Sequence, residues 1–197
     1  MRGIERVEYT PASVRETLTQ MKDISELMID LSYSAALAND FGLAEEVIEL
    51  EKRVDVLIYV LQMNLMVAAR SPEDAESLVG VARVGSLTNS ISDAAADVAE
   101  LVLNNINIHP LVREVFQRTE EHLLRVEISE GSTLAGKTLE ELDLASRFGV
   151  NVIALKRGKY WMIRPEKEVI HPEDILMARG TMSGLKTLEE VGRGRLG

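Results

Sequence analysis

The sequence predicts an α+β protein of two domains: an antiparallel three-helix bundle, then a small α/β domain with a mostly antiparallel sheet. Residues 13–107 hold three long helical patterns, whereas residues 123–179 hold short apolar runs separated by turn signals. Charge divides in the same way, because residues 1–120 carry 10 Lys and Arg against 20 Asp and Glu, and the remainder carries 12 against 12. We therefore place the domains at 1–119 and 120–197.

Three long helices are predicted for the first domain, from Ser13 to about Asn39, from about Leu43 to Arg70 and from Ser71 to about Asn107. Ser13 and Ser71 are expected to act as N-caps, and Pro72 suits the first helical position. Apolar residues at three- and four-residue spacing in the second helix predict a packing seam formed by Val47, Leu50, Val54, Leu57, Leu61 and Leu65. A short helix from Pro110 to Thr119 is expected to link the domains.

The second domain is centred on the stretch from Gly131 to Gly158. Thr138 and Glu141 have capping-box spacing, which predicts the start of a short helix, and Gly149 is expected to end it. The apolar run Val150–Leu155 predicts a buried strand. Further strands are predicted over Leu123–Ile128, Tyr160–Arg164 and Ile175–Arg179, with a last helix beginning near Met182.

Three phrases in this domain, GSTLAGKTLEELDL, RFGVNVIALKR and PEDILMARG, resemble the TrkA C-terminal domain, also called the RCK C-terminal domain. The resemblance extends from about Leu123 to Glu190. It implies a module that dimerises and attaches to cation transporters or channels, often as a ligand sensor. Glu173 stands where the family usually has glycine in a P-G-D turn, so we expect a turn without a left-handed residue there.

The three long helices resemble a PhoU-like repeat, which often carries a D/E-x-x-x-D spacing. The matching pairs are Glu26 with Asp30, Glu51 with Asp55, and Asp93 with Asp97. At about 100° per residue, the first pair lies opposite the apolar face of its helix, whereas the other two pairs flank theirs. Two interpretations stay open: a solvated acidic surface, or a metal site formed by Glu51, Asp55, Asp93 and Asp97.

Asn151 is the only polar side chain in the predicted buried strand, so its amide needs a partner. That partner is either backbone or a ligand, because some TrkA C-terminal domains bind cyclic di-AMP at this helix–strand edge between two copies. The resemblance implies a lining formed by Phe148, Val150, Asn151, Ile153 and Pro165. Ala145 occupies a position that is commonly basic in nucleotide-binding members, and Arg147 or Arg164 is the expected substitute.

Several kinds of chemistry are excluded or disfavoured. The chain has no cysteine, so it lacks disulfides and zinc-thiolate sites, and its net charge of −10 argues against nucleic acid. No apolar run reaches about 18 residues, which predicts a soluble chain. NAD regulation is not expected, because no G-x-G-x-x-G follows a strand. The octet GSTLAGKT satisfies the bare phosphate-loop pattern, but no parallel strand and long helix surround it.

The resulting hypothesis is a cytoplasmic regulatory subunit of a cation transport system, with potassium as the cation, peripheral to the membrane through its partner. A homodimer is expected, together with a membrane transporter or channel and a small ligand such as cyclic di-AMP. No enzymatic activity and no particular cofactor are predicted. The alternatives are a metal-binding or phosphate-signalling adaptor, or a nucleotide-hydrolysing enzyme that uses the octet.

Overall fold

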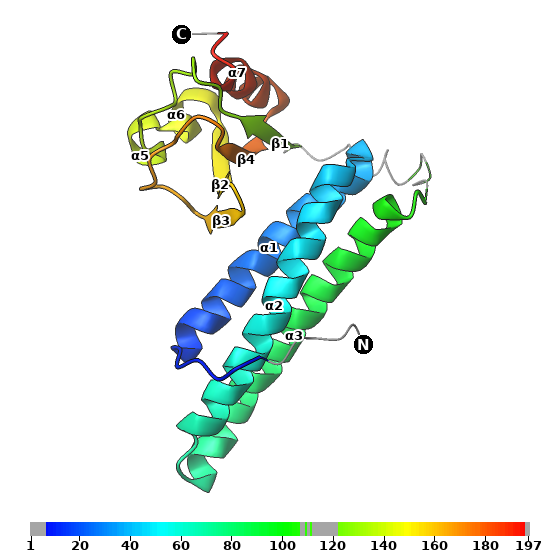
Figure 1. Ribbon diagram of the computed structural model, residues 1–197, viewed down its shortest axis with the longest axis vertical. Helices are drawn as coiled ribbons and strands as arrows, with labels where there is room; N and C mark the ends of the chain where they lie inside the picture. Colours follow the sequence, from blue (N-terminus) through cyan, green and yellow to red (C-terminus); the bar gives the residue numbers. More distant parts are fainter. Residues whose placement is uncertain (1–6, 107–108, 110, 112–121, 196–197) are drawn as a thin grey trace. The chain divides into compact units, whose positions relative to one another are not determined.

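The computed structural model describes residues 7–106, 109, 111 and 122–195 (Figure 1). The chain divides into two compact units, Met1–Pro110 and Leu111–Gly197. The predicted domain boundary and most of the linking helix predicted over 110–119 lie outside the described residues, so both stay predictions. Within the described ranges, no helix is both long enough and apolar enough to cross a bilayer.

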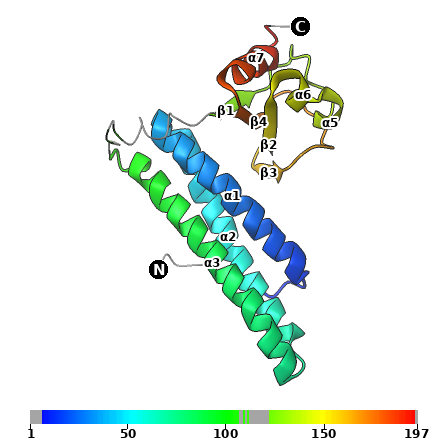
Figure 2. The same cartoon turned by 180° about the vertical axis from the view of Figure 1, so that it is seen from behind.

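The first unit is a bundle of three long antiparallel helices, as predicted (Figures 1 and 2). They are α1 (Val14–Ala38), α2 (Phe41–Ala68) and α3 (Pro72–Leu103). Both predicted serine caps are present, since Ser13 Oγ accepts a hydrogen bond from the Glu16 N–H and Ser71 Oγ accepts one from the Asp74 N–H. These bonds satisfy backbone donors that have no partner inside the first turn.

Two helix ends differ from the prediction. The second helix begins at Phe41 rather than near Leu43, because Asp40 Oδ1 accepts from the Leu43 N–H at 3.1 Å and caps α2 directly. The end of α3 precedes the expected Asn107, because Asn105 adopts a left-handed conformation with φ of 55°. A left-handed residue just beyond the last turn is a common helix stop, and asparagine tolerates it better than most side chains.

The bundle core follows the predicted seams. In α2 all the predicted seam residues are buried except Leu57, which is half-buried. The core also holds hydroxyl groups, since Ser25 Oγ of α1 lies 2.7 Å from Ser92 Oγ of α3, and both residues are buried. The pair satisfies two polar groups across the interface, so their burial carries no unpaired-donor cost.

The second unit is built on a four-stranded antiparallel sheet, which confirms the predicted sheet type. The strands are β1 (His122–Glu127), β2 (Val150–Arg157), β3 (Tyr160–Ile163) and β4 (Ile175–Gly180), in the order β1-β4-β2-β3. Two short helices, α5 (Leu139–Leu142) and α6 (Leu144–Phe148), precede β2, and α7 (Met182–Gly192) follows β4. Side chains of α5, α6, α7 and the sheet share one apolar core.

The capping box at Thr138 and Glu141 and the stop at Gly149 are confirmed. The single helix expected between them is wrong, because Asp143 takes a left-handed conformation (φ 43°) that separates α5 from α6. The expectation that Asn151 is buried is also wrong: β2 alternates at its start, with Val150 buried and Asn151 exposed. Asn151 therefore meets no desolvation cost that would require a protein partner.

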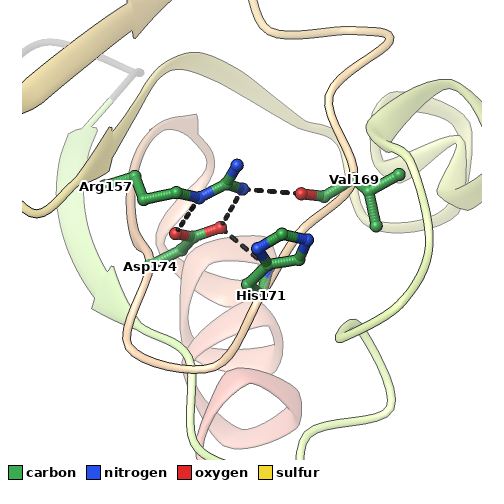
Figure 3. A network of polar contacts seen from close by, with 4 residues as sticks. All are labelled: Arg157, Val169, His171 and Asp174. Carbon is green, nitrogen blue, oxygen red and sulfur yellow. Dashed lines mark hydrogen bonds and ion pairs between the residues drawn. The ribbon is translucent and has the colours of Figure 1, made fainter.

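An ion pair between a buried carboxylate and a half-buried arginine joins β2 to the turn that precedes β4 (Figure 3). Arg157 contacts both carboxylate oxygens of Asp174, at 2.8 Å from Nε and 2.7 Å from a terminal nitrogen, and that same nitrogen donates to the Val169 carbonyl. The side chain of Asp174 is only 2% exposed, and it also accepts from the His171 N–H at 2.7 Å. Hydrogen bonding to Asp174 raises the pKa of Arg157, so the guanidinium stays charged.

The same turn contradicts one expectation, because Glu173 is left-handed, with φ of 69°. The conformation costs about 1–2 kcal/mol for a residue with a side chain. Backbone bonds on both sides of Glu173 hold it there: its own N–H donates to the Ile128 carbonyl at 2.8 Å, and the Asp174 N–H donates to the His171 carbonyl at 3.2 Å. The turn thus holds a left-handed residue at this position without a glycine.

We expect Arg157→Met to destabilise the second unit more than Asp174→Asn. The first change leaves a buried carboxylate without its cation, which costs about 3–5 kcal/mol. The second change keeps an acceptor for the His171 N–H and leaves a guanidinium that reaches water. The expected loss of unfolding free energy is therefore about 1–3 kcal/mol. Denaturant unfolding of the full chain, followed by the fluorescence of Trp161, reports on this unit because the chain has one tryptophan.

Lys159→Met is the matched control, because Lys159 is an exposed cation in the turn between β2 and β3. Its loss should leave the unfolding midpoint within about 0.5 kcal/mol of the parent. If Arg157→Met behaved like this control, the ion pair would not hold the turn in place.

Candidate ligand-binding cleft

The second unit contains an open cleft of about 900 Å³, which lies in the range of small-molecule sites. One wall comes from α5, α6 and the start of β2, and the other from the end of β3 and the loop after it. The lining residues are Leu139, Glu140, Asp143, Leu144, Ala145, Val150, Asn151, Val152, Met162, Ile163, Arg164, Pro165, Glu166, Lys167 and Glu168.

The loop wall is fixed by backbone hydrogen bonds to the segment that opens α5. The Gly136 N–H donates to the Ile170 carbonyl at 2.8 Å, and the Ile170 N–H donates back to the Lys137 carbonyl at 2.9 Å. A third bond runs from the Glu140 N–H to the Glu166 carbonyl at 2.9 Å. Because Arg157 also binds this loop at Val169, both walls are held in position by the protein alone.

The cleft has a mainly apolar lining, and its charged residues are net negative. Its ionisable lining residues are Glu140, Asp143, Arg164, Glu166, Lys167 and Glu168, which amounts to four carboxylates against two cations. Arg164 and Lys167 are the lining side chains that can pair with a phosphate. Arg164 adopts a left-handed conformation with φ of 54°, and its N–H donates to the Ile153 carbonyl at 3.1 Å. Strained residues of this kind gather at binding sites, so the cleft-side Arg164 is a candidate for phosphate recognition.

Three of the five residues expected to bind ligand line the cleft: Val150, Asn151 and Pro165. Phe148 and Ile153 do not. Phe148 is half-buried and packs against the apolar core, while Ile153 lies at a register shift where β2 bulges between Val152 and Ala154. The bulge interrupts the regular side-chain alternation of β2 at this residue. The ligand-binding roles of all five residues stay predictions.

Of the two arginines proposed to replace a basic residue at Ala145, only Arg164 lines the cleft together with Ala145. The guanidinium of Arg147 lies over the Phe148 ring, 5.1 Å from its centroid. The loop residues Glu166 to Glu168 were missed as lining. A usable signal was present, because a proline and a charged run follow a predicted strand directly.

The octet GSTLAGKT does not form a phosphate loop. It follows β1, an edge strand that pairs antiparallel with β4, and it leads into α5, a helix of four residues. The N–H groups of its last three residues, Gly136 to Thr138, already donate to protein oxygens at 2.8 to 3.3 Å. Phosphate loops need such donors directed at the ligand, so the nucleotide-hydrolysing alternative has no structural support in this octet.

The four candidate metal ligands lie on α2 and α3. Glu51 and Asp55 are half-buried, whereas Asp93 and Asp97 are exposed. Asp93 accepts a hydrogen bond from the Asn89 side chain at 3.2 Å. Among the residues that the structure describes, no three or more His, Cys, Asp or Glu side chains come close enough together to hold a metal ion. The four carboxylates therefore do not form a metal site within one copy of the chain, and the metal site stays a prediction.

Two family models match this chain. The model of the PhoU domain matches residues 18–102, which lie in the three-helix bundle, and the model of the TrkA-C domain matches residues 123–191, which hold the sheet and the cleft. Fold and cleft thus define a helical bundle joined to a small α/β domain with a ligand-sized cavity. The chain thus contains a match to the PhoU domain followed by a match to the TrkA-C domain.

Curated relatives are potassium transport proteins. The chain is 40% identical over 95 residues to the Ktr system potassium uptake protein C of Bacillus subtilis (strain 168), covering 48% of this chain and 42% of that protein. It is 25% identical over 138 residues to the probable potassium channel protein 2 of Methanocaldococcus jannaschii, covering 66% of this chain and 40% of the channel protein. The chain thus spans less than half the length of each relative.

Among solved structures, similarity is found to the RCK C domain of the potassium transport protein KtrA in complex with cyclic di-AMP. The identity is 27%, the TM-score is 0.34, and the match covers 41% of this chain and 94% of that domain. BusR of S. agalactiae in complex with its busAB-promotor DNA is matched at 13% identity with a TM-score of 0.35, over 95% of this chain and 100% of BusR.

We expect the full chain to fold without a metal ion. Carboxylates held side by side without a cation would repel each other, and the exposure of Asp93 and Asp97 to solvent avoids that cost. Chelation should therefore shift the melting temperature by no more than a few degrees, equivalent to about 1 kcal/mol. A large drop with chelator that one particular cation reverses would contradict this and establish the acidic faces as a metal site.

Proposed function

We propose that this chain is a cytoplasmic regulatory subunit of a potassium transport system and that it senses a small ligand through the cleft of its TrkA-C domain. The observation that carries the proposal is the coincidence of the TrkA-C match with a cleft of about 900 Å³ whose two walls are fixed by hydrogen bonds. The 40% identity to a Ktr system potassium uptake protein supports potassium as the transported ion.

The cleft offers a simple physical route to sensing. A ligand that contacts Asn151 on one wall and the Arg164–Lys167 loop on the other binds best when both walls are in place. It stabilises that arrangement by RT ln(1 + [L]/Kd), which is about 2.7 kcal/mol at a hundredfold excess over Kd. Regulation then requires that the transporter distinguish the ligand-bound arrangement from the free one.

The homodimer and the membrane transporter or channel belong to the same proposal. Cyclic di-AMP is the proposed ligand. We expect Asn151 to form a hydrogen bond with a base or ribose and Arg164 to bind a phosphate. The PhoU match supports one alternative, a metal-binding or phosphate-signalling adaptor built on the helical unit. Metal analysis of the purified full chain separates the regulatory subunit from the metal-binding form of the adaptor, because only that form retains a stoichiometric cation.

In a titration of the full chain with cyclic di-AMP, Arg164→Ala should weaken binding at least tenfold. The arginine supplies a charge-assisted hydrogen bond in a cleft that is otherwise net negative, and such bonds contribute about 1.5–3 kcal/mol. Asn151→Ala should also reduce affinity without changing the unfolding midpoint, because its side chain is exposed. Isothermal calorimetry measures both effects.

Arg147→Ala is the control, since Arg147 is another exposed arginine of this domain and does not line the cleft. Its affinity should equal that of the parent. Equal losses for Arg147→Ala and Arg164→Ala would indicate a non-specific charge effect, and no loss for Arg164→Ala would move the ligand elsewhere.

The transport role is tested by affinity capture of the full chain from detergent-solubilised membranes of its source organism. The expected outcome is co-purification of a potassium transporter or channel, recovered in proportion to the bait. Recovery of soluble proteins alone, in repeated captures at low salt, would argue against a transport subunit and favour the adaptor.

A further inference from the structure

α3 carries an apolar seam outside the bundle core. Its members recur at alternating intervals of three and four residues: Val84, Leu87, Ile91, Ala94, Val98 and Leu101. The four largest that face water, Val84, Leu87, Ile91 and Leu101, are 38% to 50% exposed. A separate stripe of α3 is buried against the other helices: Gly85, Ser92, Ala95, Ala96, Ala99 and Val102. The helix thus has two seams, and its own bundle covers only the inner one.

The outer seam borders a groove of about 490 Å³ between α1 and α3. The groove is lined by Ile29, Ser32, Tyr33, Leu87, Ser90, Ile91, Ala94, Ala95 and Val98, none of which is charged. A long apolar groove between two helices, continuous with an exposed heptad seam, is suited to a further helix rather than to a charged small molecule.

The seam is complementary to itself when it is reversed. An antiparallel copy of α3 pairs Val84 with Leu101 of the second copy, Leu87 with its Val98, and Ile91 with its Ala94. Each layer joins a larger side chain to a smaller one, so the interface fills evenly, and Ala94 allows close approach at the centre. The seam extends for about 26 Å at 1.5 Å per residue.

Charged residues beside the seam also favour an antiparallel orientation of the second α3 helix. Arg83 and Asp97 are both exposed and are separated by two heptads, so they lie on the same flank near opposite ends of the seam. Reversing the second helix brings its Asp97 to within about 7.5 Å of Arg83 along the helix axis. A parallel pair would instead place these flank charges against the Ala95 and Val102 side of the partner helix, which is buried in the bundle core.

We infer that the outer seam of α3 is a self-association surface, in which the α3 helices of two copies of this chain pack antiparallel. The inference rests on the homodimer included in the proposed function and assigns a specific surface to it. The interface is isologous, as closed dimers require, since the same residues serve on both sides.

The test uses the absence of cysteine from the natural chain. Two full-length variants, Val84→Cys and Leu101→Cys, are prepared separately, mixed and oxidised, with a short bismaleimide reagent as a second cross-linker. Both substitutions are conservative in size and lie at exposed positions, so both variants are expected to fold. The mixture should give a covalent heterodimer, whereas neither variant alone should cross-link, because antiparallel packing keeps like positions far apart.

A third change on both chains supplies the matched control. Ile91→Glu should reduce the cross-linked fraction at least fivefold, while Val79→Glu, at a 65% exposed position of the same helix outside the seam, should leave it unchanged. Cross-linking of each cysteine variant with itself would overturn the antiparallel arrangement. A dimer by light scattering that gives no cross-link would contradict the outer seam as the dimer interface but leave the proposed homodimer intact. A monomer would contradict both proposals.

Discussion

The ion pair between Arg157 and Asp174 is the constraint on which the cleft depends. It lies where the end of β2, the turn before β4 and the loop after β3 meet (Figure 3). Because Asp174 is almost wholly buried, the ion pair has a defined geometry. Three backbone hydrogen bonds join the same loop to the segment that opens α5 and to α5 itself. The walls of the cleft are therefore in place before a ligand binds. Binding then costs less conformational entropy, because the walls do not have to become ordered.

Strain in the same loop is consistent with this view. Arg164 and Glu173 are both left-handed without being glycine, at a cost of about 1–2 kcal/mol each, and both lie in the segment that forms or supports one wall. Close packing completes the support elsewhere. A Cβ on Gly184 would come within 2.1 Å of the Phe148 carbonyl, so α7 can approach the end of α6 only with glycine there. The cleft is thus bounded by parts of the chain with little freedom to shift.

The general fold could be predicted because its signals are local. Ser13, Ser71 and the Thr138–Glu141 box each satisfy backbone donors within three residues, and the α2 seam follows helical periodicity. The cleft could be predicted only in part, because it depends on register. The family resemblance implied that Ile153 lines it, but a bulge between Val152 and Ala154 changes the register of β2 at this residue. The exposure of Asn151 depends on tertiary packing, which no short pattern in the sequence reports.

Hydrogen exchange of the full chain tests most directly whether the cleft is preformed. The amide protons of Gly136, Glu140 and Ile170 close the loop wall onto α5, so in the absence of ligand they should exchange about as slowly as those of the β2–β4 ladder. In the Arg157→Met variant these three should become faster together, while amides of the three-helix bundle keep their rates. Fast exchange of the three amides in the parent chain would contradict the account, because the cleft would then form only when a ligand binds.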